Sequence, residues 1–233
     1  RMTFLCIAAF SLFTFIYLFC TLPKVPSHGG FSVRRMPEIL RNRTLISIFT
    51  LTLLFATAYY TGYSYIEPFL LQVAHMSESL ITVTLMLFGG AGILGSIAFS
   101  RFYPLNPSRF ITVALCGMFF SLLLLYPATA AIQLIICLCA FWGMAATSYN
   151  VSFQNEIINH TSDDATPVAM SISSGIFNLG IATGTLIGGG VCTHLSIAYI
   201  GFAGAAIAIL MLLFWYFSTS TTCKKSSAIS AKP

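Results

Sequence analysis

The sequence predicts an all-α, polytopic transmembrane helix bundle, and three observations carry that prediction. Apolar stretches of about 17 to 25 residues, the length that crosses a bilayer as a helix, fill nearly the whole chain. Hydrophobic residues make up 57% and charged residues only 7% of the 233 positions, and the mean hydropathy is +0.88. Of the 11 Lys and Arg residues, all but Arg1 fall on one side of the implied membrane. Lipid is therefore the expected solvent.

Helices are predicted rather than barrel strands, because strands would need segments of about 10 residues that alternate apolar and polar side chains, and none is visible. We place the spans at residues 4–22, 44–66, 79–99, 110–127, 131–152, 166–189 and 195–217. Proline marks two helix starts. Asn106 before Pro107 and Thr166 before Pro167 predict a capping side chain followed by proline at the first helical position.

The segment 23–43 differs from the other connections, which are short. It carries three prolines, two glycines and five basic residues, a composition typical of a flexible linker between two bundles. The basic loops predict that this linker and the C-terminal tail face the cytoplasm. An odd number of spans then places Arg1 outside, so we expect the chain to be the later part of a longer protein.

Glycines recur at helical spacing in two spans. Gly180, Gly184 and Gly188 lie four residues apart on one face of the span 166–189, and the span 79–99 contributes Gly89, Gly92 and Gly95. Small residues at such positions let helix backbones approach closely in a membrane. The pattern predicts helix packing. Static packing and a sliding or gating seam both agree with it.

The span 44–66 carries the richest group of polar side chains. Tyr59, Tyr63 and Glu67 recur at i, i+4 and i+8, which predicts one stripe with two phenols and a carboxylate, suited to binding a polar solute. A carboxylate that alternates between dry and wet surroundings changes its pKa as proton coupling requires. Glu67 is therefore a candidate coupling residue. The alternative is a carboxylate solvated at the membrane interface beside an aromatic belt.

Three further side chains lie inside later spans. Asn178 lies in the middle of the glycine-rich span, where an unpaired amide is costly, so we expect a partner on another helix or a wet cavity. Trp142 and Tyr149 are seven residues apart and share a helix face. Their rings suit stacking on a sugar or a flat drug, or simple packing.

Signals for other classes of function are missing from the sequence. It has no nucleophile elbow, no zinc-protease motif, no phosphate-binding loop and no metal-ligand cluster, so neither an enzyme nor a cofactor nor a metal site is predicted. The net charge of +5 is spread over loops between apolar spans, which argues against a nucleic-acid partner.

Four segments together resemble bacterial sugar efflux transporters of the major facilitator superfamily, the SotB type. They are the opening Arg1–Phe4, YYTGYSYIEPF at 59–69, LFGGAGILGS at 87–96 and AMSISSGIFNLGIATG at 169–184. The resemblance implies that residues 1–22 are the last helix of an N-terminal bundle, 23–43 the central cytoplasmic loop, 44–217 the C-terminal six-helix bundle and 218–233 a cytoplasmic tail. The loop 100–110 lacks the acidic and arginine-rich gating pattern of that superfamily.

The same resemblance implies proton-coupled export of sugars or related small molecules by alternating access across the bacterial inner membrane. The expected partners are a small-molecule substrate, protons, the lipid bilayer and the N-terminal half of the same transporter. A proton antiporter for drugs or chloramphenicol is the nearest alternative. A seven-helix receptor or sensor, with an external amino terminus, is an alternative from another class.

Overall fold

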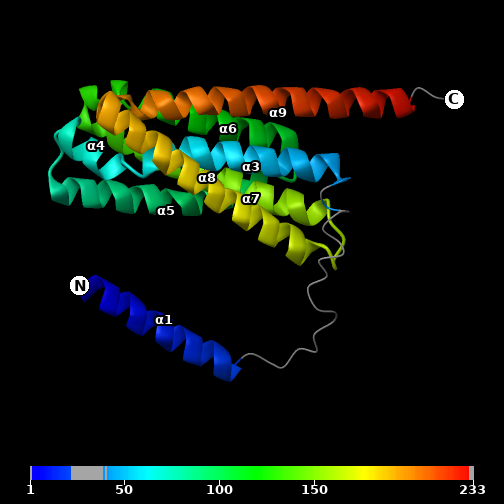
Figure 1. The fold of residues 1–233 in the computed structure, drawn as a ribbon, viewed down its shortest axis with the longest axis horizontal. Coiled ribbons are helices and arrows are strands. Elements are labelled where there is room, and N and C mark those ends of the chain that lie inside the picture. Colours follow the sequence, from blue (N-terminus) through cyan, green and yellow to red (C-terminus); the bar gives the residue numbers. More distant parts are fainter. Residues whose placement is uncertain (1, 22–38, 40, 231–233) are drawn as a thin grey trace. The chain divides into compact units, whose positions relative to one another are not determined.

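The computed structural model describes residues 2–21, 39 and 41–230, and every regular element in these ranges is helical (Figure 1). The prediction of an all-α bundle is therefore confirmed. The elements are α1 (Met2–Thr21), α3 (Arg43–Tyr63), α4 (Ile66–Gln72), α5 (Glu78–Phe102), α6 (Pro107–Leu123), α7 (Ile132–Asn159), α8 (Thr166–His194) and α9 (Ile200–Ser230), with the 3-10 turns η2 (Pro127–Ala130) and η3 (Ile197–Tyr199). Helix α1 belongs to one compact unit, and α3 to α9 form another.

Six helical segments in the described part are long and apolar enough to cross a membrane: Phe4–Thr21, Arg43–Gln72, Glu78–Phe102, Ile132–Asn159, Thr166–His194 and Ile197–Thr219. The remaining expected span corresponds to α6, which has 17 residues. At 1.5 Å per residue α6 is about 26 Å long, slightly less than a hydrocarbon core of about 30 Å. Large apolar side chains such as Met86 and Leu186 point outward, with 70% and 78% of their surfaces exposed. The chain is a membrane protein.

A break interrupts the first span of the bundle. Helix α3 ends at Tyr63, Ser64 and Tyr65 form a turn, and α4 begins at Ile66. Pro68 explains the break, because it has no N–H to donate to the carbonyl of Ser64, and its ring crowds that carbonyl. The hydroxyl of Ser64 lies 2.9 Å from that of Thr185, so the turn is tied to α8.

Other boundaries also differ from those expected. Helix α7 continues seven residues beyond the expected end at residue 152, and α9 continues to Ser230, within the segment 218–233 that was expected to be a tail. Asn106 caps α6 as predicted, since its side-chain oxygen accepts a hydrogen bond from the N–H of Arg109 at 3.1 Å. The prediction for Thr166 is wrong. Thr166 is already helical, and its hydroxyl donates back to the carbonyl of Ser162.

The helices α3 to α9 pack in a pattern that repeats. The most extensive contacts join α5 to α7 and α3 to α8, followed by α3 with α9, α6 with α7 and α6 with α9. This set of pairs is unchanged when α3 is exchanged with α7, α5 with α8 and α6 with α9. The bundle therefore consists of two three-helix units of equivalent packing. Because each unit has an odd number of spans, the second runs in the opposite direction to the first (Figure 1).

The antiparallel course of the helices gathers arginines at one end of this bundle. Arg43 begins α3, Arg101 lies in the last turn of α5 and Arg109 in the first turn of α6. We call this the basic end. Glu67 in α4 and Glu78 at the start of α5 lie at the opposite end.

Candidate functional site

A groove with polar walls runs between α3, α7 and α8. Its first part has a volume of about 290 Å³, and seven of its ten lining side chains carry a hydroxyl or an amide. The lining residues are Thr52, Tyr149, Asn150, Phe153, Gln154, Met170, Ser173, Ser174, Phe177 and Asn178. No carboxylate, Lys, Arg or His is among them, so this part of the groove offers neutral hydrogen-bonding groups.

A second part of about 250 Å³ continues the first, because Asn150 and Phe177 line both. Five of the eleven lining residues here are aromatic, and the wall exposes backbone at Gly89. The lining residues are Phe55, Tyr59, Tyr60, Phe88, Gly89, Gly143, Ala146, Thr147, Asn150, Val151 and Phe177. We call the two parts together the polar–aromatic groove.

Two amides on α7 mark the centre of the groove. Asn150 and Gln154 lie one helical turn apart, and the Nε2 of Gln154 donates to the Oδ1 of Asn150 at 2.6 Å. The amide N–H₂ of Asn150 and the amide oxygen of Gln154 then remain for a ligand. These groups match solutes that both donate and accept hydrogen bonds.

Asn178 on α8 lines the same groove from the opposite wall. Its Nδ2 donates to the carbonyl of Ser174 in its own helix at 2.8 Å, and its side chain is exposed. Of the two expectations for this amide, lining a cavity is the one that agrees with its position. Within the described residues no hydrogen bond from its side chain to another helix is formed.

The aromatic side chains form a continuous stack along α3 and α7. Phe55 and Tyr149 stack with ring centroids 3.6 Å apart, and Tyr149 stacks on Phe153 at 4.1 Å. Further along α3, Tyr59 follows Phe55 at 6.0 Å, and Tyr63 follows Tyr59 at 4.9 Å. Tyr149 lines the first part of the groove and Tyr59 the second, whereas Tyr63 lines neither.

Trp142 lies behind this stack and not in the groove. It is fully buried, with its ring against those of Tyr59 and Phe88 at centroid distances of 5.5 and 5.6 Å. Its indole N–H and the hydroxyl of Tyr149 are buried without a hydrogen-bond partner. Because such groups are costly, their retention indicates that ring shape dominates at these two positions.

Glu67 lies outside the groove. The helix break described above places it on α4, so the expected stripe with Tyr59 and Tyr63 does not continue to it. Glu67 is exposed and lines a different cavity of about 550 Å³ with Glu78 and side chains of α5. Among the described residues, no acidic side chain lines the groove itself.

The glycines of α8 lie against α3. A Cβ atom added at Gly180 would stand 2.5 Å from the Cβ of Ala56, one at Gly184 would stand 2.5 Å from the carbonyl oxygen of Thr57, and one at Gly188 would stand 2.6 Å from that of Thr61. Only glycine permits this approach.

In α5, Gly92 and Gly95 make an equivalent contact with α7. Added Cβ atoms there would stand 2.7 Å from the hydroxyl of Thr147 and 2.5 Å from the carbonyl oxygen of Met144. Gly89 differs, because nothing lies within 4 Å of its Cβ position. It was expected to pack against a helix, and instead it opens onto the groove.

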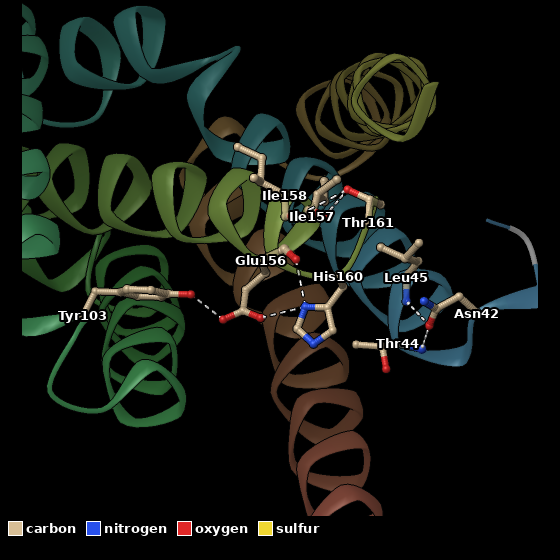
Figure 2. A network of polar contacts seen from close by, with 9 residues as sticks. All are labelled: Asn42, Thr44, Leu45, Tyr103, Glu156, Ile157, Ile158, His160 and Thr161. Carbon is tan, nitrogen blue, oxygen red and sulfur yellow. Dashed lines mark hydrogen bonds and ion pairs between the residues drawn. The ribbon is translucent and has the colours of Figure 1, made fainter. Parts of the chain in front are cut away.

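A separate polar network occupies the basic end (Figure 2). The hydroxyl of Tyr103, just beyond α5, donates a short hydrogen bond to Oε1 of Glu156 on α7, and Nδ1 of His160 lies 3.4 Å from Oε2. Burial raises the pKa of Tyr103 to about 12, and the hydrogen bond to Glu156 adds to the increase. The network joins the ends of α5 and α7. Sequence reasoning missed it because Glu156 was expected in a loop.

No group of three or more His, Cys, Asp and Glu side chains that could hold a metal occurs in the part of the chain that the structure describes. No protein-family model matches the sequence. The groove residues that sequence reasoning did not single out are mainly Thr52, Ser173, Ser174 and Phe177. Their one available signal is polar spacing on α8, where positions 173, 174 and 178 recur at helical period.

Proposed function

We propose that the chain is the C-terminal portion of a proton-coupled exporter of sugars or related small molecules, of the major facilitator type. The observation that carries the proposal is the polar–aromatic groove, which combines neutral amides and hydroxyls with aromatic rings inside a membrane bundle. Phenol and amide groups bind sugar hydroxyls, and ring faces stack on the apolar faces of sugars. A neutral wall suits a neutral solute.

The repeated packing pattern supports the transporter class. Two three-helix units that run in opposite directions match the inverted repeats from which each half of a major facilitator transporter is built. The first helices of the two units, α3 and α7, both line the groove, together with α8 and part of α5. The receptor alternative predicts no such exchange of helices.

Alternating access gives the groove its role. One bundle supplies one wall of a central site, a second bundle supplies the other, and rocking of the two exposes the site to each side of the membrane in turn. The N-terminal half of the same transporter is the proposed partner, and the bacterial inner membrane is the proposed location, with the basic end toward the cytoplasm.

Transport by the complete protein in proteoliposomes tests the proposal. With an imposed pH gradient, flux of a neutral sugar is expected, and Asn150→Ala and Asn178→Ala should reduce it at least tenfold without loss of folded protein. Gln133→Ala is the matched control, because Gln133 is an exposed amide on α7 outside the groove. Equal flux in all three variants would remove the groove from the mechanism.

The choice of substrate is tested in the same vesicles. The aromatic part of the groove also favours flat apolar drugs, which makes a drug antiporter the second candidate. Loss of drug flux in Tyr60→Ala with unchanged sugar flux would favour that candidate. Loss of sugar flux in Asn150→Ala with unchanged drug flux would favour the exporter of sugars.

Proton coupling is proposed to involve Glu67. The groove wall has no described carboxylate, and Glu67 lies four residues beyond Tyr63, the last ring of the aromatic stack on α3. Glu67→Gln should leave the protein folded and abolish the dependence of sugar flux on the pH gradient. Glu78→Gln serves as the control, because Glu78 lines the same cavity as Glu67. Unchanged pH-driven flux in Glu67→Gln would exclude Glu67 from coupling.

A further inference from the structure

A second groove, unrelated to the candidate site, opens on the outer side of the bundle. It has a volume of about 360 Å³ and lies between α5 and α6 with α7 as its floor. The two wall helices are joined by a short turn and pack on α7, but they make few contacts with each other. The lining residues are Ala98, Phe102, Asn106, Arg109, Phe110, Val113, Ala114, Phe141, Met144, Ala145 and Ser148.

The floor and walls of this groove are apolar. Phe102 and Val113 have 53% and 68% of their surfaces exposed, and Ala114 and Ala145 are buried beneath them. The hydroxyl of Ser148 is taken up by a hydrogen bond to the carbonyl of Gly95 at 3.3 Å. A groove of this kind offers contact to hydrocarbon and few hydrogen bonds.

The polar groups lie at one end, which is the basic end of the bundle. The side chain of Asn106 is occupied by capping α6. Arg109 is exposed, and within the described residues its guanidinium forms no ion pair. The groove therefore presents one cation at the mouth of an apolar channel.

The length of the groove matches a single leaflet. From Asn106 to Ala114 the wall rises over eight residues, or about 12 Å at 1.5 Å per residue. Half of a hydrocarbon core is about 15 Å. The groove thus runs from the membrane interface at Arg109 to near the midplane.

We propose that this groove binds one acyl chain of an anionic phospholipid, with the phosphate of its headgroup on Arg109. Basic pockets between helices on the cytoplasmic side of a membrane attract anionic headgroups, and an acyl chain lying along α7 would cover apolar surface that the other helices from α3 to α9 leave open. The groove runs along the helices α5 and α6, which as membrane spans would lie roughly along the bilayer normal, the direction of a lipid tail.

Native mass spectrometry of the full-length protein in detergent tests the proposal, with dioleoyl phosphatidylglycerol and dioleoyl phosphatidylcholine as the two probes. We expect one phosphatidylglycerol to be retained in preference to phosphatidylcholine. Arg109→Gln should weaken phosphatidylglycerol binding about fivefold, since one basic residue near the surface contributes about that factor. Arg101→Gln is the matched control, because it removes the same charge at the same end and does not line the groove.

The acyl-chain part is tested by filling the groove. Ala98→Phe should lower retention of both lipids. Independently, phosphatidylglycerol with a diazirine in its acyl chain should label the peptides that contain residues 98–114 and 141–148 of the unmodified protein. This second measurement does not depend on the folding of any variant.

Three results would overturn the proposal. Equal losses in Arg101→Gln and Arg109→Gln would mean that the basic end attracts lipid through its general charge. Labelling elsewhere in the chain would place the lipid outside the groove. Absence of labelling at residues 98–114 and 141–148, with those residues protected by another protein segment, would show that a helix covers the groove.

Discussion

The contact between α8 and α3 predicts a large and specific effect of one added methyl group. In Gly184→Ala the new Cβ would stand 2.5 Å from the carbonyl oxygen of Thr57, 3.1 Å from the N–H nitrogen of Thr61 and 3.1 Å from the Cβ of Tyr60. A relaxed carbon–oxygen contact is about 3.3 to 3.6 Å, so α8 would have to move away by nearly 1 Å. The atoms that it meets belong mainly to backbone, which cannot rotate aside.

The magnitude follows from two opposing contributions. Overpacking of a tight interface costs about 1 to 3 kcal/mol. Replacement of glycine by alanine inside a helix returns about 0.5 to 1 kcal/mol. We therefore expect Gly184→Ala to lower the free energy of unfolding by roughly 1 to 2 kcal/mol.

Gly190→Ala is the matched control on the same helix. Nothing lies within 4 Å of its Cβ position, so only the helix-propensity gain of about 0.5 to 1 kcal/mol remains. Unfolding in mixed micelles, followed by far-ultraviolet circular dichroism, measures both variants. If Gly184→Ala proved as stable as Gly190→Ala, the seam would be loose and the packing argument would fail.

Three further effects follow from particular side chains. Tyr149→Phe should raise the free energy of unfolding by about 1 kcal/mol, because it removes a buried hydroxyl that has no hydrogen-bond partner, and urea or detergent titration checks this. Tyr103→Phe should lower the unfolding midpoint at pH 7, because it removes the donor to Glu156. In the unmodified protein the pKa of Tyr103 is raised to about 12, so this stabilisation should be complete below pH 10 and lost as the pH rises through 12, which melting curves between pH 7 and 12 measure. Asn106→Ala should cost about 1 kcal/mol through loss of the α6 cap, whereas Asn106→Ser should restore most of it.

The helical elements were predictable because hydropathy acts over whole spans. Each expected span contains a helix, and Asn106 marks the start of α6 correctly. Local chemistry explains the errors. The hydroxyl of Thr166 donates to the carbonyl of Ser162, so it does not cap α8 as expected. Pro68 lacks an N–H, which divides the span that carries Glu67 into α3 and α4.

The groove could be predicted only in part. Tyr59, Tyr149 and Asn178, which the sequence offered as candidates for a solute-binding wall, all line the groove. The packing partner of each helix could not be predicted, because the sequence pattern describes one helix at a time. The spacing of Gly184 indicates that another helix approaches closely. Tertiary packing decides that this helix is α3 and that α7 closes the groove.

The exchange of partners between the two three-helix units has a consequence for folding. The middle helix of each three-helix unit packs mainly against the first helix of the other unit, α5 against α7 and α8 against α3. Neither three-helix unit forms a packed core by itself, so unfolding of one unit removes the most extensive helix contacts of the other. Amide protons in α3 and α7 should therefore be released to exchange together, in a single opening event.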